Sequence, residues 1–147
     1  GGLCLKVHYD NEGFFVIGED KCAYYNDSGK AEMSYDYPSK LIDWDFSSKG
    51  AALLFKNETK RQSYFTTISS DKKTPNEKSF DNSEVKCIRF SGSSVLVMNK
   101  DGINRYGFKG SDETNITSDT SYDKFVIVDD YIFMLGYDRI DRIKESV

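Results

Sequence analysis

Hydrophobic positions along the chain follow one pattern that recurs four times. A stretch in which apolar and polar residues alternate, such as residues 41–46, leads through a short polar turn into a continuous apolar run. Alternation predicts a strand with one buried face, whereas a short unbroken apolar run predicts a strand that is covered on both faces. The pattern therefore predicts an all-β protein in which each covered strand lies between two neighbouring layers.

The recurring pattern divides the chain into units of similar length. Tyr9, Phe46, Phe90 and Val128 occupy equivalent positions, and their spacing is close to the roughly 40 residues of a four-stranded propeller blade. A β-sandwich or barrel of short strands is the alternative that the same turn spacing allows. We predict one domain, residues 1–147, made of repeat units at 4–40, 41–83, 84–122 and 123–147, of which the last is incomplete.

Polar turns complete each unit. The turn "NKDG" (99–102) follows an apolar run, and an Asp-Gly pair between two strands is a strong hairpin signal because glycine accepts a positive φ. The equivalent turns at 18–21, 57–60 and 136–139 are expected at the same rim. In the second unit the polar tract 69–78 is expected to be a solvated loop, with only a few residues near Phe80 left for an outer strand.

Two segments carry a resemblance to a known class of repeat. The sequences "IDWDFSSKGAALLF" (42–55) and "VKCIRFSGSSVLVMNKDGINRY" (85–106) resemble the strand, turn and strand of WD-like and YVTN-type β-propeller repeats. The resemblance implies a β-propeller-like array of about four blades that is a fragment of a larger ring. The only Trp-Asp pair starts at Trp44, in the first strand of its unit, so the chain departs from the true WD40 pattern.

The chain is also similar to uncharacterised membrane-anchored proteins of Gram-positive bacteria that carry an extracellular propeller-like region. This similarity implies an extracellular or cell-surface location, with an anchor in a removed N-terminal segment. No window of the chain itself approaches the roughly 20 apolar residues of a membrane span. Because an open array of blades leaves apolar faces bare, we expect the chain to form a homo-oligomer through its exposed blade faces.

Charge and cysteine content exclude some classes of protein. The net charge of −4 comes from acidic and basic residues that are mixed along the chain, without the basic stripe of a nucleic-acid-binding protein. The three cysteines Cys4, Cys22 and Cys87 have no metal-binding spacing and are odd in number. Each lies in a strand-like apolar run, so we expect three buried, inert thiols.

Candidate catalytic chemistry is sparse. The single histidine, His8, lies in a strand without a nucleophile beside it, and the chain has no Gly-x-Ser-x-Gly elbow. Asp43 and Asp45 share one face of a strand, and we expect Asp45 to pair with a charge on an adjacent blade. No catalytic residue, metal site or cofactor is predicted.

Candidate binding residues come from the rim at which propellers usually bind their ligands, which is an analogy of fold. Acidic and tyrosine side chains at this rim suit a protein, peptide or carbohydrate ligand. The sequence thus favours a non-enzymatic interaction or ligand-sensing module of the cell envelope. The alternative is part of a propeller enzyme, hydrolase or quinoprotein-like, whose catalytic residues lie outside this chain. The candidates are Glu19, Asp20, Asn57, Glu58, Asp101, Tyr137 and Asp138, with Tyr35, Tyr37 and Tyr122 nearby.

Overall fold

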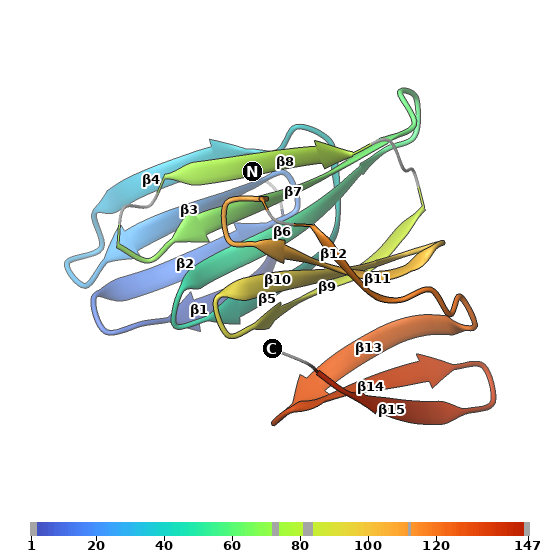
Figure 1. Ribbon diagram of the computed structural model, residues 1–147. Coiled ribbons are helices and arrows are strands. Elements are labelled where there is room, and N and C mark those ends of the chain that lie inside the picture. The colour runs from blue at the N-terminus through green and yellow to red at the C-terminus, as the bar shows by residue number, and fades with distance from the viewer. Residues whose placement is uncertain (1–2, 72–73, 81–83, 112, 146–147) are drawn as a thin grey trace.

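The computed structural model describes residues 3–71, 74–80, 84–111 and 113–145. These residues form four antiparallel sheets that follow one another from the N-terminus to the C-terminus (Figure 1). None of them forms a helix that is long and apolar enough to span a membrane. The strands are β1 (Cys4–Tyr9), β2 (Gly13–Gly18), β3 (Lys21–Asn26), β4 (Ala31–Asp36), β5 (Lys40–Ser47), β6 (Gly50–Asn57), β7 (Gln62–Ser69), β8 (Pro75–Phe80), β9 (Val85–Ser91), β10 (Ser94–Asn99), β11 (Gly102–Gly107), β12 (Thr114–Thr117), β13 (Tyr122–Val128), β14 (Tyr131–Gly136) and β15 (Ile140–Lys144).

Each sheet is a simple meander, in which consecutive strands are neighbours. The first three sheets have four strands each, and the fourth has the order β13-β14-β15. Inner strand β9 contacts both β5 and β13, the inner strands of the sheets on either side. The chain is therefore all β, with the β-propeller-like array of about four blades that the sequence predicted. We call the sheets the first to fourth blade.

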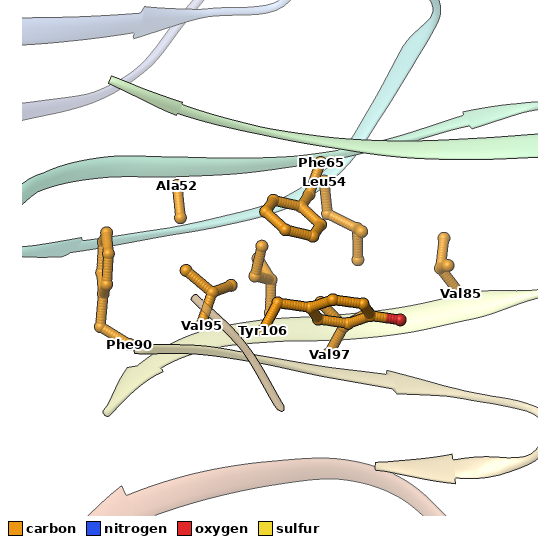
Figure 2. Packing of buried hydrophobic residues seen from close by; sticks show 9 residues of the cluster. Ala52, Leu54, Phe65, Val85, Phe90, Val95, Val97 and Tyr106 are labelled. Carbon is orange, nitrogen blue, oxygen red and sulfur yellow. The ribbon is translucent and has the colours of Figure 1, made fainter. Parts of the chain in front are cut away.

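Three apolar clusters hold the array together, one at each seam between adjacent blades. Figure 2 shows the cluster between the second and third blades, where Leu54 and Phe65 face Val95, Val97 and Tyr106. All five side chains are at most 2% exposed. Burial of apolar surface at these seams is the main stabilising contribution, at about 25 cal/mol per Å².

The continuous apolar runs of the middle blades are covered on both faces, as predicted. In β6, Leu53 and Phe55 belong to the cluster with the first blade, while Ala52 and Leu54 belong to the cluster with the third. In β10 the same alternation sends neighbouring side chains to the second and fourth blades. Side chains of a strand alternate between its faces, so a run without polar residues needs a neighbour on each side.

The first and fourth blades differ, because each is covered on one face. In β2, Phe15 is buried, whereas its neighbours Phe14 and Val16 are half-buried. In β14, Ile132 and Met134 are buried, whereas their neighbours Tyr131, Phe133 and Leu135 are half-buried. The prediction of coverage on both faces therefore holds for the middle blades and is wrong for the two end blades.

The hairpin at 99–102 has the geometry that its sequence predicted. Asn99 pairs with Gly102, and Lys100 and Asp101 form the two-residue tip. Gly102 has a φ of 123°, and a Cβ atom there would lie 2.0 Å from the carbonyl oxygen of Thr117. Glycine is required at this position both by its φ and by the close approach of β12.

The tract 69–78 is not the long loop that was expected. β7 ends at Ser69 and β8 begins at Pro75, and β8 pairs with β7 along its whole length. Because β8 is an outer strand, its exposed polar side chains carry little apolar signal, and its proline stands at the first position, where a strand tolerates it. The second blade is thus a complete four-stranded sheet.

Candidate functional site

Four hairpin turns lie at the same end of their blades, and those after β6, β10 and β14 are at the right in Figure 1. They connect β2 to β3, β6 to β7, β10 to β11 and β14 to β15. The repeated meander brings them together, because the equivalent strands of successive blades run in the same direction. We call this surface the hairpin rim. It contains all seven candidate binding residues: Glu19, Asp20, Asn57, Glu58, Asp101, Tyr137 and Asp138.

Most of these seven side chains are exposed, and Asn57 is half-buried. Asn57 caps its own turn, since its Oδ1 accepts the Lys60 backbone N–H at 3.1 Å. Glu58 lies 3.7 Å from the ammonium group of Lys56. Each of the four turns also carries a lysine or an arginine, so the rim presents mixed charges rather than a strongly acidic surface.

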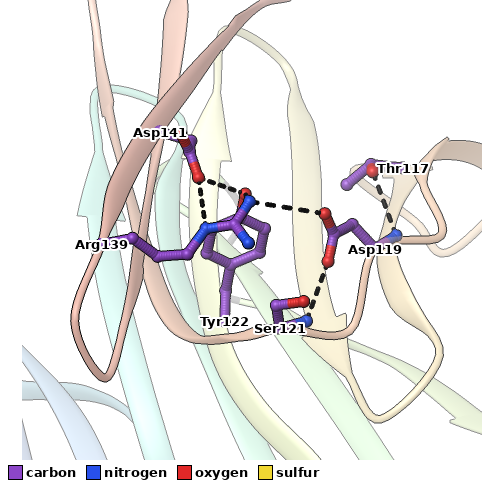
Figure 3. Close-up of polar contacts among 6 residues, drawn as sticks. All are labelled: Thr117, Asp119, Ser121, Tyr122, Arg139 and Asp141. Atoms are coloured by element: carbon purple, nitrogen blue, oxygen red, sulfur yellow. Dashed lines mark hydrogen bonds and ion pairs between the residues drawn. The ribbon is translucent and has the colours of Figure 1, made fainter.

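One sector of the rim is fixed by a polar cluster, shown in Figure 3. Arg139 Nε donates to Asp141 Oδ2 at 2.7 Å, and Arg139 Nη2 donates to the Tyr122 hydroxyl at 2.7 Å. The Tyr122 hydroxyl in turn donates to Asp141 Oδ2 at 2.6 Å. These hydrogen bonds from Tyr122 and Arg139 hold the pKa of Asp141 below its usual value.

The same cluster connects the fourth blade to the chain that leaves the third. Asp119 Oδ1 accepts the Ser121 backbone N–H at 2.9 Å, and this bond is the main cause of the lowered Asp119 pKa. The other oxygen of Asp119 lies 4.0 Å from the Arg139 guanidinium. The turn that carries Tyr137 is therefore anchored at its base, while the Tyr137 side chain itself is 99% exposed.

The other tyrosines expected near the rim have internal partners. The Tyr37 hydroxyl donates to the Gly18 carbonyl at 2.8 Å, and the Tyr35 hydroxyl donates to Glu77 Oε1 at 2.7 Å. Burial raises the pKa of both phenols well above the usual value. Tyr122 is 3% exposed and packs against the third blade. These three rings support the rim rather than extend from it.

Asp43 and Asp45 both face the third blade, but their partners differ from the prediction. Asp43 Oδ2 accepts from Arg89 Nη1 at 2.7 Å and from the Ile88 backbone N–H at 3.0 Å. Asp45 Oδ2 accepts the Phe90 backbone N–H at 2.8 Å, and burial raises its pKa. The expected ion pair of Asp45 is therefore formed by Asp43, two residues earlier. Both carboxylates satisfy N–H groups on the edge of β9 and have a structural explanation.

Cysteine and histidine also have structural explanations. Burial raises the pKa of Cys22 to about 12 and that of Cys87 to about 11, so both thiols stay protonated at neutral pH. Cys4 is exposed, which corrects the expectation of three buried thiols. His8 stacks on Phe46 at 4.4 Å between ring centroids. Among the described residues no group of three or more His, Cys, Asp or Glu side chains could hold a metal ion.

Comparison with known proteins places the chain in a family. The sequence profile of the family described as "Family of unknown function (DUF5711)" matches residues 1–144. The chain belongs to DUF5711. No curated protein sequence matches it at a significant level.

Solved structures that resemble this DUF5711 chain include Hsv2 of Kluyveromyces lactis, BamB of Moraxella catarrhalis and KlAtg21 in complex with the coiled coil of AgAtg16. Their TM-scores are 0.63, 0.65 and 0.67, at 14%, 10% and 13% sequence identity. The matches cover 98%, 96% and 100% of this chain, and 49%, 42% and 54% of those chains. The likeness shows the fold, and the DUF5711 chain spans about half the length of these structures.

The opposite end of the DUF5711 array has features that the sequence did not single out. Shallow hollows of about 460, 440 and 510 Å³ lie over the three seams, lined by the turns after β1, β5, β9 and β13. At the last seam Arg105 pairs with Glu145 at 2.5 Å, and Ser91 also donates to Glu145. In the sequence these turns are short polar segments, and their contacts with the neighbouring blade could not be predicted from it.

Proposed function

We propose that this DUF5711 domain is a non-enzymatic interaction module that binds a protein, peptide or carbohydrate ligand at the hairpin rim. The observation that carries the proposal is the Tyr137 ring, which is 99% exposed on a turn that the Arg139 cluster anchors. A tyrosine has few rotatable bonds, so an exposed ring on a fixed turn offers contact area at a low entropic cost.

The rest of the rim suits a broad contact better than a deep pocket. The four turns are short hairpins, and exposed Asp20, Glu58 and Asp101 each have a lysine within two residues. Such a surface provides hydrogen-bond donors and acceptors for the polar edge of an interface around an aromatic anchor. KlAtg21, which this chain resembles in fold, was solved bound to the coiled coil of AgAtg16, and this supports a protein as the ligand class.

We further propose that the domain works at the outside of a Gram-positive cell envelope. This location is inferred from the resemblance to membrane-anchored proteins with an extracellular propeller-like region that we expect from the sequence. Protease treatment of intact cells that make the protein should remove the domain, while a cytoplasmic marker protein survives. Survival of the domain until the cells are broken would contradict this location.

Site-specific photocrosslinking tests the rim. A photoreactive phenylalanine analogue is placed at Tyr137 or, as the matched control, at the exposed Ser93 at the opposite end of the array. In cells that naturally make the protein, position 137 should give a discrete adduct upon illumination and position 93 should not. Mass spectrometry of the adduct identifies the ligand as a protein or a glycan. Equal crosslinking at both positions, or none at position 137, would overturn the rim as the binding site.

A further inference from the structure

The first and the fourth blade each present an uncovered sheet face. We call the outward side of the first blade the leading face. Phe14 and Val16 lie on this face, because they alternate along β2 with residues that are buried against the second blade. Their partners on the neighbouring strands, Val7, Tyr9 and Tyr25, lie on the same face. The rings of Tyr9, Phe14 and Tyr25 form a row, with 5.4 Å between neighbouring centroids.

We call the outward side of the fourth blade the trailing face. It carries Val126, Val128, Phe133, Leu135 and Ile140, which share one side of β13, β14 and β15. Across the described residues, every large hydrophobic side chain that is exposed belongs to one of the two end blades or to the residue that leads into β1: Leu3, Leu5, Val7, Tyr9, Val126, Val128, Tyr137 and Ile140. Exposed apolar surface is thus concentrated on the first and fourth blades, and such surface marks a contact site.

The leading and trailing faces are the two kinds of face that already pack together inside the molecule. At each of the three seams, the trailing side of one blade packs on the leading side of the next. The trailing face of the fourth blade and the leading face of the first would therefore continue the same series of contacts.

The charges on the two faces are complementary. On the outer strand of the leading face, Glu32 and Asp36 are exposed on the same side as the apolar row. On the trailing face Lys124, Arg142 and Lys144 are exposed, and all three share a side with Leu135, Phe133 or Tyr131. Lys21 is a basic residue on the leading face, opposite Asp36. The leading face is net acidic and the trailing face is basic, so the same face of two copies would repel.

The length of the array fits a half ring. The chain aligns over 98% of its length with 49% of Hsv2, and over its whole length with 54% of KlAtg21. Two arrays of this curvature would together span one propeller of that size. We propose that two copies of this chain associate head to tail, with each leading face on the other copy's trailing face, and so close one ring.

A hollow on the leading face fits this arrangement. It has a volume of about 430 Å³, and Leu3, Cys4, Val16, Ala23 and Tyr25 form its apolar lining. At the internal seams the equivalent space is filled by aromatic and aliphatic side chains, as where Tyr106 packs on Phe65 at 5.2 Å between centroids. Half-buried Phe133 and Leu135 are the apolar side chains that the trailing face offers to fill it.

Charge reversal tests the proposal, because head-to-tail contact predicts a result that a symmetric face-to-face dimer does not. One variant combines Glu32→Lys with Asp36→Lys, and the other combines Arg142→Glu with Lys144→Glu. All four side chains are exposed, so both variants should fold, and circular dichroism checks this. In each variant alone, like charges meet at both contacts. In an equimolar mixture of the two variants, one copy of each restores opposite charges at both contacts.

Size-exclusion chromatography with light scattering provides the measurement. The unmodified chain is expected at about twice its mass of 16.8 kDa, each variant alone at 16.8 kDa, and the mixture again at about twice that mass. A monomeric unmodified chain at every concentration would overturn the proposal and assign the two faces to further blades of the same protein. A dimer that survives in each variant alone, or a mixture that stays monomeric, would also overturn it.

Discussion

The middle and end blades of this array carry similar apolar runs, yet the runs end up in different surroundings. Residues 51–55 of β6 are all 0% exposed, because the first and third blades cover both sides of the strand. In β2 and β14 only alternate residues are buried. A strand whose sequence is apolar on both faces is therefore suited to a position between two neighbouring blades. The first and fourth blades have such strands but only one neighbouring blade each.

The sharpest contrast between covered and uncovered surface lies within the first blade. Cys4 is exposed beside the leading face, whereas Cys22 is buried against the second blade with its pKa raised from 9.0 to about 12. Only the thiolate is nucleophilic, and this shift lowers the thiolate fraction of Cys22 at neutral pH by roughly a thousandfold. Alkylation of the folded protein with iodoacetamide should modify Cys4 alone.

Mass spectrometry of the alkylated protein gives the site, and protein in denaturant is the control in which all three cysteines react. The concentration dependence sharpens the result, because a head-to-tail dimer covers the hollow that Cys4 lines. Alkylation of Cys4 should then slow as the protein concentration rises. Rapid labelling of Cys22 under native conditions would contradict the packing of the first seam.

The contribution of a leucine to stability should differ between a middle blade and an end blade. Leu54 is 0% exposed in the cluster between the second and third blades, whereas Leu135 is half-buried on the trailing face. Leu54→Ala should lower the free energy of unfolding by about 2–5 kcal/mol, because it leaves a cavity in a packed core. Leu135→Ala should cost roughly 1 kcal/mol or less in the monomer, because its side chain is only partly removed from water.

Urea denaturation at low protein concentration measures both variants. The same Leu135→Ala variant should weaken dimerisation, which chromatography at higher concentration reports separately. Equal losses of stability for the two variants in the monomer would show that the trailing face is covered in a way that this structure does not contain.

Ion pairs give a smaller contrast between the interior and the rim. Asp43→Ala removes the partner of the Arg89 guanidinium and the acceptor of the Ile88 N–H at the second seam. Leaving such partly buried donors unpaired should cost about 1–3 kcal/mol. Glu58→Ala breaks a pair at the rim in which the Glu58 side chain is 74% exposed, and should cost at most about 0.5 kcal/mol. Thermal unfolding compares the two, and a similar cost for both would refute the structural role of Asp43.

The sequence predicted the repeat and the middle of each blade because these features are local. The unbroken run of β6 and the Asp-Gly hairpin at 101–102 depend on alternation and on the φ of one glycine. The full length of strand β8 could not be predicted, because most of its residues are polar like those of a loop and its pairing with β7 is visible only in three dimensions. Outer strands of blades thus have a weak local signal.

The partners of side chains could be predicted only in part. Asp43 and Asp45 were placed on the face toward an adjacent blade, and this is confirmed. Which of them meets Arg89 depends on the stagger between β5 and β9 and on the irregular register between Leu41 and Asp43. Similarly, the sequence identified Tyr137 as a rim residue, but the contacts of Arg139 that anchor its turn join segments about 20 residues apart. Relations of this kind follow from the tertiary fold.

The smallest expected effect concerns the charge of Asp45, and it depends on pH. Burial raises the folded-state pKa of Asp45 above its ordinary value of 3.8, so the folded protein binds the proton more tightly than the unfolded chain does. The ionised carboxylate therefore disfavours folding above the raised pKa, and this cost disappears as the pH falls below the ordinary value. Asp45→Asn removes the charge, and the amide oxygen can still accept the Phe90 N–H.

The variant should thus be slightly more stable than the unmodified chain at neutral pH and equally stable in acid. Urea denaturation across this pH range gives the difference directly, with Asp101→Asn at the exposed rim as the control that should show no such gain. A loss of stability for Asp45→Asn at neutral pH would mean that attraction to Arg89 outweighs burial. Asp45 would then belong with Asp43 as an electrostatic contact of the second seam, and the seam would depend on both carboxylates being ionised.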